Sequence, residues 1–131
     1  MTDTIHILVA DDEEVIRNAC MRILTRAGYD VAVAVNGDDA LRKINEGNFD
    51  LVLLDLKMPV MDGMKVLEIL AKEKPGLRVV VITGHGTAET VGQAVRAGAS
   101  DFLTKPFTPS ELRYSVQKAL AGASHMETKA I

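Results

Sequence analysis

Polar side chains that could bind a metal ion or a phosphoryl group lie where four short candidate strands of the sequence end. They are Asp11 and Asp12 after the run 5–10, Asp55 after 51–54, Thr83 at the end of 78–83, and Lys105 after 100–104. Three carboxylates brought together repel one another, so we expect a hard divalent cation with oxygen ligands, Mg²⁺, among them. Protein-bound Mg²⁺ keeps several waters and often binds a phosphate, and an ammonium and a hydroxyl are suited to hold phosphoryl oxygens. The set therefore predicts phosphoryl-transfer chemistry.

Each of these side chains also has a simpler explanation. The acidic residues from Asp11 to Glu14 could cap a helix and favour its positive end. Asp55 could be a turn aspartate, Thr83 a helix cap and Lys105 a solvated lysine. These separate explanations do not account for the occurrence of all of these residues at the ends of predicted strands. No glycine-rich nucleotide-binding motif is present, so the phosphoryl group must come from another donor.

The elements that must position these residues are short strands alternating with longer helices. Strands are predicted at 5–10, 30–35, 51–54, 78–83 and 100–104. The runs 51–54 and 79–82 are apolar without alternation, which is typical of central parallel strands covered on both faces. The pattern predicts an α/β fold with helices on both sides of a parallel sheet. In such sheets ligands bind beyond the carboxyl ends of the strands, which is where the polar residues lie.

The helix predictions depend on apolar residues at helical spacing and on end signals. The first helix carries Ile16, Cys20 and Ile23 on one face and stops at Gly28, so Cys20 is expected in the core. The segment 108–111, Thr-Pro-Ser-Glu, has the pattern of a capping box and begins the last helix. Residues 122–131 show no sustained periodicity and are interpreted as a tail or the start of a linker, without a function.

Composition restricts the classes of function. The chain has 131 residues, 47% hydrophobic and 25% charged, which predicts one globular domain. Fifteen basic and 18 acidic residues give a net charge of −3 without a basic block, so direct nucleic-acid binding is not expected. The single cysteine and the lack of a leader pattern predict a cytoplasmic setting. No apolar run approaches the ~18 residues of a membrane span, so no membrane contact is expected.

Together these motifs resemble the receiver domains of two-component response regulators, over about residues 4–121. The matching segments are Asp-Asp at 11–12, Asp-Leu-Lys-Met-Pro-Val-Met-Asp-Gly at 55–63, Thr-Gly at 83–84 and Lys-Pro-Phe at 105–107. The resemblance implies a flavodoxin-like, doubly wound fold with a five-stranded parallel sheet of order 2-1-3-4-5. It implies that Asp55 is the phosphoacceptor and that Thr83 and Lys105 contact the phosphoryl group. The implied Mg²⁺ ligands are Asp11, Asp12, Asp55 and the backbone carbonyl of Lys57.

The same resemblance implies a donor and a lifetime for the modified state. The donor is a phosphohistidine on a sensor histidine kinase or a histidine phosphotransfer protein. Metal and Lys105 offset the negative charge that accumulates when a carboxylate attacks phosphorus. Water can attack the resulting acyl phosphate in the same geometry, so we expect it to decay spontaneously. Lys57 and His85, which the family leaves variable, are candidates for setting its lifetime.

Two further residues carry expectations from the family. Phe102 lies where receivers usually have an aromatic residue that swings inward as the threonine hydroxyl turns to the phosphoryl group, so Thr83 and Phe102 form the expected switch. The alternative is that Phe102 is ordinary core. The altered face consists of the fourth helix, fifth strand and fifth helix, and a partner or a second copy of the chain would dock there. Pro106 is expected to follow a cis peptide bond.

Two other classes of protein are alternatives. Aspartyl-phosphate phosphatases usually carry a second aspartate two residues after the nucleophile, where this chain has Lys57. A flavin-binding module would need a phosphate-cradling loop where Asp11 and Asp12 would repel phosphate. We therefore expect a signalling domain that catalyses only its own phosphorylation and dephosphorylation. The segment 83–86 resembles nitrogen-regulator receivers, which precede ATPase and DNA-binding domains, but a free-standing output is equally open.

Overall fold

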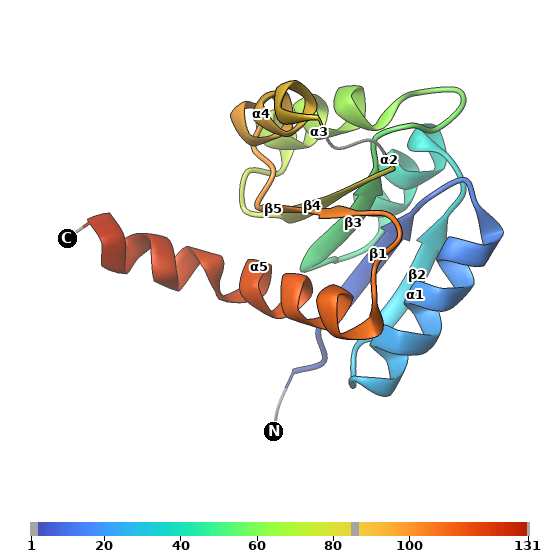
Figure 1. Cartoon of the computed structure of the whole chain (residues 1–131), viewed down its shortest axis with the longest axis horizontal. Helices are drawn as coiled ribbons and strands as arrows, with labels where there is room; N and C mark the ends of the chain where they lie inside the picture. Colours follow the sequence, from blue (N-terminus) through green and yellow to red (C-terminus); the bar gives the residue numbers. More distant parts are fainter. Residues whose placement is uncertain (1–2, 85–86, 131) are drawn as a thin grey trace.

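A five-stranded parallel sheet carries helices on both faces (Figure 1). This computed structural model describes residues 3–84 and 87–130, and side chains up to residue 122. The elements in chain order are β1 (His6–Ala10), α1 (Glu14–Arg26), β2 (Asp30–Ala34), α2 (Gly37–Glu46), β3 (Leu51–Asp55), α3 (Gly63–Glu73), β4 (Arg78–Thr83), α4 (Ala88–Arg96), β5 (Asp101–Thr104) and α5 (Pro109–Ala130). The strand order is β2-β1-β3-β4-β5, which confirms the predicted fold.

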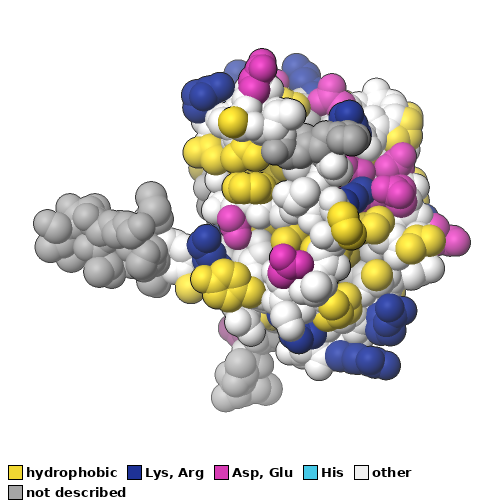
Figure 2. All heavy atoms as spheres, viewed as in Figure 1, with side chains coloured by type: hydrophobic (Ala, Val, Ile, Leu, Met, Phe, Trp, Pro, Cys, Tyr) yellow, Lys and Arg dark blue, Asp and Glu magenta, His cyan; other side chains and the backbone are white. Residues whose placement is uncertain are grey.

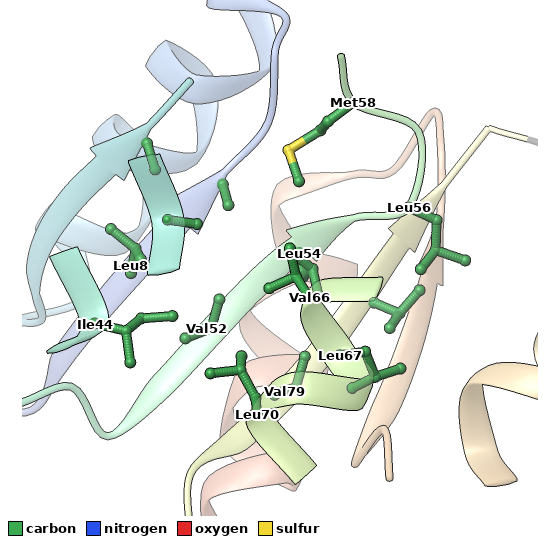
Figure 3. Packing of buried hydrophobic residues seen from close by; sticks show 14 of the residues in the cluster. Leu8, Ile44, Val52, Leu54, Leu56, Met58, Val66, Leu67, Leu70 and Val79 are labelled. Carbon is green, nitrogen blue, oxygen red and sulfur yellow. The ribbon is translucent and has the colours of Figure 1, made fainter. Parts of the chain in front are cut away.

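The central strands divide the core into two layers because successive side chains of a strand point to opposite faces. Val52 and Leu54 of β3 join a cluster that contains residues of α2, α3 and α4, part of which is shown in Figure 3. Leu51 and Leu53 join the other cluster, which contains residues of α1 and α5. All five residues of β3 are buried. The unbroken apolar runs therefore mark the two-sided strands, as predicted.

The core face and the carboxyl end of the first helix follow the sequence signals. Cys20 is a free, fully buried thiol in the α1 and α5 layer, as expected of a core residue. Burial, together with the nearby Asp11 charge and partly offset by the Lys105 charge, raises its pKa to about 12. Gly28 follows α1 with a φ of 99°, a conformation that costs glycine little.

The last helix begins as predicted and extends further than predicted. Thr108 Oγ1 accepts a hydrogen bond from the Glu111 N–H at 3.1 Å, and Glu111 Oε1 accepts one from the Thr108 N–H at 2.8 Å. The helix then continues to Ala130, so residues 122–130 of the segment that we interpreted as a tail or the start of a linker are helical. The segment contains alanine, methionine, glutamate and lysine, which favour a helix without an apolar stripe. Within the described part of the chain, no helix is both long and apolar enough to cross a bilayer.

Candidate functional site

The carboxyl ends of the strands place the predicted polar residues at one edge of the sheet. Asp11 directly follows β1, Asp55 ends β3, Thr83 ends β4 and Lys105 directly follows β5. The parallel register aligns the ends of β1 and β3 through Ala10, which pairs with the residue before Asp55. Asp11, Asp55 and Thr83 are 0%, 3% and 3% exposed. Burial of two carboxylates is rare unless charge or hydrogen bonds compensate, which points to a functional cluster.

The Lys105 ammonium supplies part of that compensation. Its Nζ lies 2.7 Å from Glu13 Oε1, 3.0 Å from Asp11 Oδ2 and 3.4 Å from Asp55 Oδ2. The Lys105 side chain is only 15% exposed, so it is not the solvated lysine of the simpler explanation. The Lys105–Pro106 peptide bond is cis, as expected from the family. The ammonium therefore lies among three carboxylates.

Backbone amides hold the two buried carboxylates in place. The N–H of Glu13 donates to Asp11 Oδ1 at 2.9 Å, and the N–H of Lys57 donates to Asp55 Oδ1 at 3.1 Å. Each aspartate uses one oxygen for its own loop, while its Oδ2 faces Lys105. The local turns thus orient the free oxygens of both residues toward the same space.

The cluster fits a hard divalent cation. Asp11, Asp12, Glu13 and Asp55 each offer one carboxylate oxygen, and these oxygens all lie within 4.8 Å of one another. Asp11 Oδ2 is buried and has no hydrogen-bond partner within the described residues, although Lys105 forms an ion pair with it. An oxygen-only donor set with an orphaned carboxylate oxygen matches the preference of Mg²⁺. The predicted ligands Asp11, Asp12 and Asp55 are therefore brought together.

The pKa values of the site residues follow from the same geometry. Burial raises the pKa of Asp55 to about 6, because the hydrogen bond from the Lys57 N–H and the Lys105 charge only partly offset burial and the Asp11 charge. Burial by itself would lower the pKa of Lys105, but the hydrogen bond to Glu13, the ion pair with Asp11 and the charge of Asp55 raise it above its ordinary value. Lys105 thus stays charged at neutral pH.

The remaining predicted residues lie around this cluster. Lys57 is exposed and contributes its N–H to Asp55. His85 lies outside the described residues. The Phe102 ring is 40% exposed on β5, opposite Val81 in register, so the ring is not ordinary core in this conformation.

Three residues that matter to the site were not singled out from the sequence. Glu13, which we grouped with possible helix caps, pairs with Lys105. A Cβ at Gly63 would lie 2.1 Å from the backbone oxygen of Asp55, so only glycine allows α3 to approach the acceptor strand. Val60, in the loop between β3 and α3, has a φ of 73°, which is unusual for a β-branched residue. One signal for Glu13 is visible in the sequence: a glutamate stands directly before the first helix, at the N-cap position, where shorter polar side chains are preferred.

Comparison with known proteins decides the family. The family model described as "Response regulator receiver domain" matches residues 7–117. The chain belongs to this family. The receiver domain is 39% identical over 117 residues to the putative response regulator NtrX-like of Rickettsia bellii, covering 88% of this chain and 24% of that protein. It is 39% identical over 123 residues to the transcriptional regulatory protein ResD of Bacillus subtilis, covering 94% of this chain and 51% of that protein.

Solved structures agree with the receiver fold. A CheY-like receiver domain protein from Methanospirillum hungatei is 31% identical with a TM-score of 0.89, over 95% of this chain and 99% of that chain. NtrX from Brucella abortus, crystallised with ADP, is 37% identical with a TM-score of 0.88, over 97% of this chain and 30% of that chain. The receiver domain thus spans a quarter to a half of the curated relatives and about a third of NtrX.

Proposed function

We propose that this receiver domain accepts a phosphoryl group on Asp55 from a phosphohistidine of a sensor histidine kinase or phosphotransfer protein, in a Mg²⁺-dependent reaction. The observation that carries the proposal is the position of the Lys105 ammonium, 3.4 Å from Asp55 Oδ2 and 3.0 Å from the buried Asp11 Oδ2. A nucleophile, a cation and an acidic metal-binding set thus share one buried edge. Phosphoryl transfer needs those three parts, because most of its catalysis is positioning and charge stabilisation.

The residues of the chain divide the work of transfer. A carboxylate oxygen of Asp55 forms the new bond to phosphorus, the bond from phosphorus to the histidine nitrogen breaks, and its electron pair stays on the imidazole. Lys105 donates to the phosphoryl oxygens, and the Thr83 hydroxyl contacts them from the end of β4. Mg²⁺, held by Asp11, Asp12, Asp55 and the backbone carbonyl of Lys57, would neutralise the accumulating negative charge.

The modified state ends by hydrolysis. Water attacks the phosphorus of the acyl phosphate, the bond to the Asp55 oxygen breaks, and inorganic phosphate leaves. The receiver domain thus catalyses only its own phosphorylation and dephosphorylation. Lys57 and His85 are proposed to set the lifetime, because each follows a site residue, Asp55 or Thr83, by two positions in the sequence.

The signal is proposed to leave through the face formed by α4, β5 and α5. Val95, Phe102 and Tyr114, one on each element, are 57%, 40% and 65% exposed, so this face carries apolar side chains that a partner or second copy could cover. Phe102 has no hydroxyl to desolvate, so its ring moves inward at little polar cost when Thr83 turns to the phosphoryl group.

Phe102→Ala should leave phosphorylation unchanged but weaken beryllofluoride-dependent self-association. An undiminished response would contradict the switch role.

The wider role rests on the longer relatives. ZraR of Escherichia coli and ResD are named as transcriptional regulatory proteins, and this chain covers 27% and 51% of them. We propose a cytoplasmic two-component pathway, with an output through an effector domain or through a separate protein partner. The receiver domain itself, with its net charge of −3, is not proposed to contact nucleic acid or membrane.

The test is labelling with acetyl phosphate, with and without Mg²⁺, followed by intact-protein mass. The wild type should gain a phosphoryl group only with Mg²⁺, and Asp55→Asn should gain none because an amide is not nucleophilic. Asp50→Asn is the matched control, since the exposed Asp50 side chain lies at the other end of β3, where it accepts a hydrogen bond from the His6 N–H. Equal labelling of Asp55→Asn would overturn the assignment. Sustained phosphate release from generic phosphoesters would favour a phosphatase, and a yellow purified protein a flavin module.

A further inference from the structure

Glu13 is the N-cap residue of helix α1, directly before Glu14, yet its carboxylate does not cap the helix. Serine, threonine, aspartate and asparagine are favoured there because a short side chain reaches the first free amides. Glu13 makes no such side-chain hydrogen bond. Its Oε1 instead accepts a hydrogen bond from Lys105 Nζ at 2.7 Å, across 92 positions of the sequence. The residue therefore serves the site rather than the helix.

The three carboxylates around Lys105 differ in their freedom to move. Asp11 and Asp55 are buried, and each is held by a backbone N–H. The Glu13 side chain is 58% exposed, and its carboxylate makes no other hydrogen bond within the part of the chain that the structure describes. An exposed ion pair contributes little to stability. Glu13 is thus the partner that Lys105 can lose most easily.

Lys105 is nevertheless closest to this partner. The contact with Glu13 is 2.7 Å, against 3.4 Å to the proposed acceptor Asp55. An ammonium has three N–H donors, and three carboxylates already surround this one. A phosphoryl group on Asp55 would bring new anionic acceptors for the Lys105 donors, and the contact with the exposed Glu13 carboxylate is the one that costs least to break.

We propose that Glu13 is a positioning residue that holds Lys105 at the carboxyl edge of the sheet in the unphosphorylated chain and releases it to the phosphoryl group. This inference rests on the proposed function and adds a regulation of the same site. Glu13 and the phosphoryl group compete for the Lys105 ammonium. The Glu13 carboxylate therefore lowers the affinity of the unphosphorylated site for an incoming phosphoryl group.

Beryllofluoride at saturating Mg²⁺ tests this competition, because it mimics the phosphoryl group on an aspartate. Saturation with Mg²⁺ is established separately for each variant, since removal of a nearby charge also weakens metal binding. Glu13→Gln should lower the beryllofluoride concentration for half-saturation, followed by amide resonances, by about two- to fivefold. Glu14→Gln is the matched control, because the next residue is also exposed and carries the same charge in the first turn of α1.

A second readout needs no phosphoryl mimic. In the Mg²⁺-free chain, the ¹⁵Nζ resonance of Lys105 should change in Glu13→Gln and stay in place in Glu14→Gln. An unchanged Lys105 resonance in Glu13→Gln, or equal effects of both variants on beryllofluoride binding, would overturn the inference. A wild type that does not bind beryllofluoride at all would contradict the phosphoacceptor function itself, and this inference with it. The two failures are therefore distinguishable.

Discussion

The two edges of the sheet carry the same residue type in opposite circumstances. At the amino edge, Asp30 Oδ2 lies 2.8 Å from His6 Nδ1, and Asp50 Oδ2 accepts a hydrogen bond from the His6 N–H at 2.8 Å. Both aspartates face solvent. At the carboxyl edge, Asp11 and Asp55 are buried side by side around one ammonium, and one carboxylate oxygen has no hydrogen-bond partner among the described residues.

The difference shows that the position of an aspartate in the fold, rather than its residue type, determines whether it can bind a metal ion or react. Each amino-edge carboxylate is exposed to solvent and contacts a different group of His6, so its charge costs little. The carboxyl-edge carboxylates share their compensation, and charge that is only partly compensated is what attracts a metal ion and a phosphoryl group. Figure 2 shows acidic and basic side chains spread over one face of the molecule, so surface charge by itself does not reveal the site.

The largest expected effect comes from pH in Mg²⁺-free buffer. The folded pKa of Asp55 is raised from 3.8 to about 6, so the stability it contributes is present below pH 4 and lost as pH rises to 6. An asparagine does not titrate, so the Asp55→Asn variant does not lose this stability as the pH rises. Its free energy of unfolding in urea should therefore rise relative to wild type by up to about 3 kcal/mol between pH 4 and 7. A difference that stays constant with pH would contradict the burial of a charged Asp55.

The next effect concerns the space around two glycines, one near each edge of the sheet. Gly63→Ala should destabilise the fold by about 2 kcal/mol, because its Cβ would overlap the backbone oxygen of Asp55 at 2.1 Å. At the amino edge, a Cβ on Gly76 meets nothing within 4 Å, so Gly76→Ala should change stability by less than about 0.5 kcal/mol. Urea unfolding of both variants measures the contrast. Equal effects would show that the carboxyl edge is not tightly packed.

A metal titration separates the acidic residues of the two edges. Asp12→Ala should weaken Mg²⁺ binding about tenfold, since it removes one of few charged ligands, whereas Asp30→Ala should not change it. Without Mg²⁺, Asp12→Ala should keep or raise the melting temperature, because it relieves repulsion among the carboxylates. Strong destabilisation in that buffer would mean that Asp12 is mainly a helix cap.

The smallest effect concerns the loop after the acceptor. Val60 has a φ of 73°, a conformation that asparagine adopts more readily than a β-branched residue. Val60→Asn should stabilise the chain by about 0.5–1 kcal/mol. Val35→Asn is the control, because Val35 is also exposed but has no positive φ. Equal changes in the two variants would show that the backbone of Val60 is not strained.

The sequence indicates most of this architecture because its signals are local. Apolar runs mark β3 and β4, and the capping box at 108–111 marks the start of α5. The polar residues that end the strands converge as expected, because parallel strands end at a common edge. The strand order came from resemblance to the family, and the sheet confirms it.

The features that the sequence did not predict depend on contacts between distant residues, on backbone conformation, or on a helix without an apolar stripe. The contact between Glu13 and Lys105 joins residues 92 positions apart and depends on how two long side chains turn. The φ of Val60 is set by the closure of the loop between Asp55 and Gly63 rather than by valine itself. The extension of α5 to Ala130 has no apolar stripe that periodicity could detect.

The central claim is that Asp55 is the phosphoacceptor of a Mg²⁺ site at the carboxyl edge, and a crystal structure of the chain with Mg²⁺ and beryllofluoride tests it most directly. The account predicts beryllium bonded to a carboxylate oxygen of Asp55. It also predicts Mg²⁺ on Asp11, Asp12, Asp55 and the Lys57 carbonyl, with Lys105 and Thr83 on the fluorides. Beryllofluoride bound to another side chain, or Mg²⁺ bound away from Asp11 and Asp55, would contradict it.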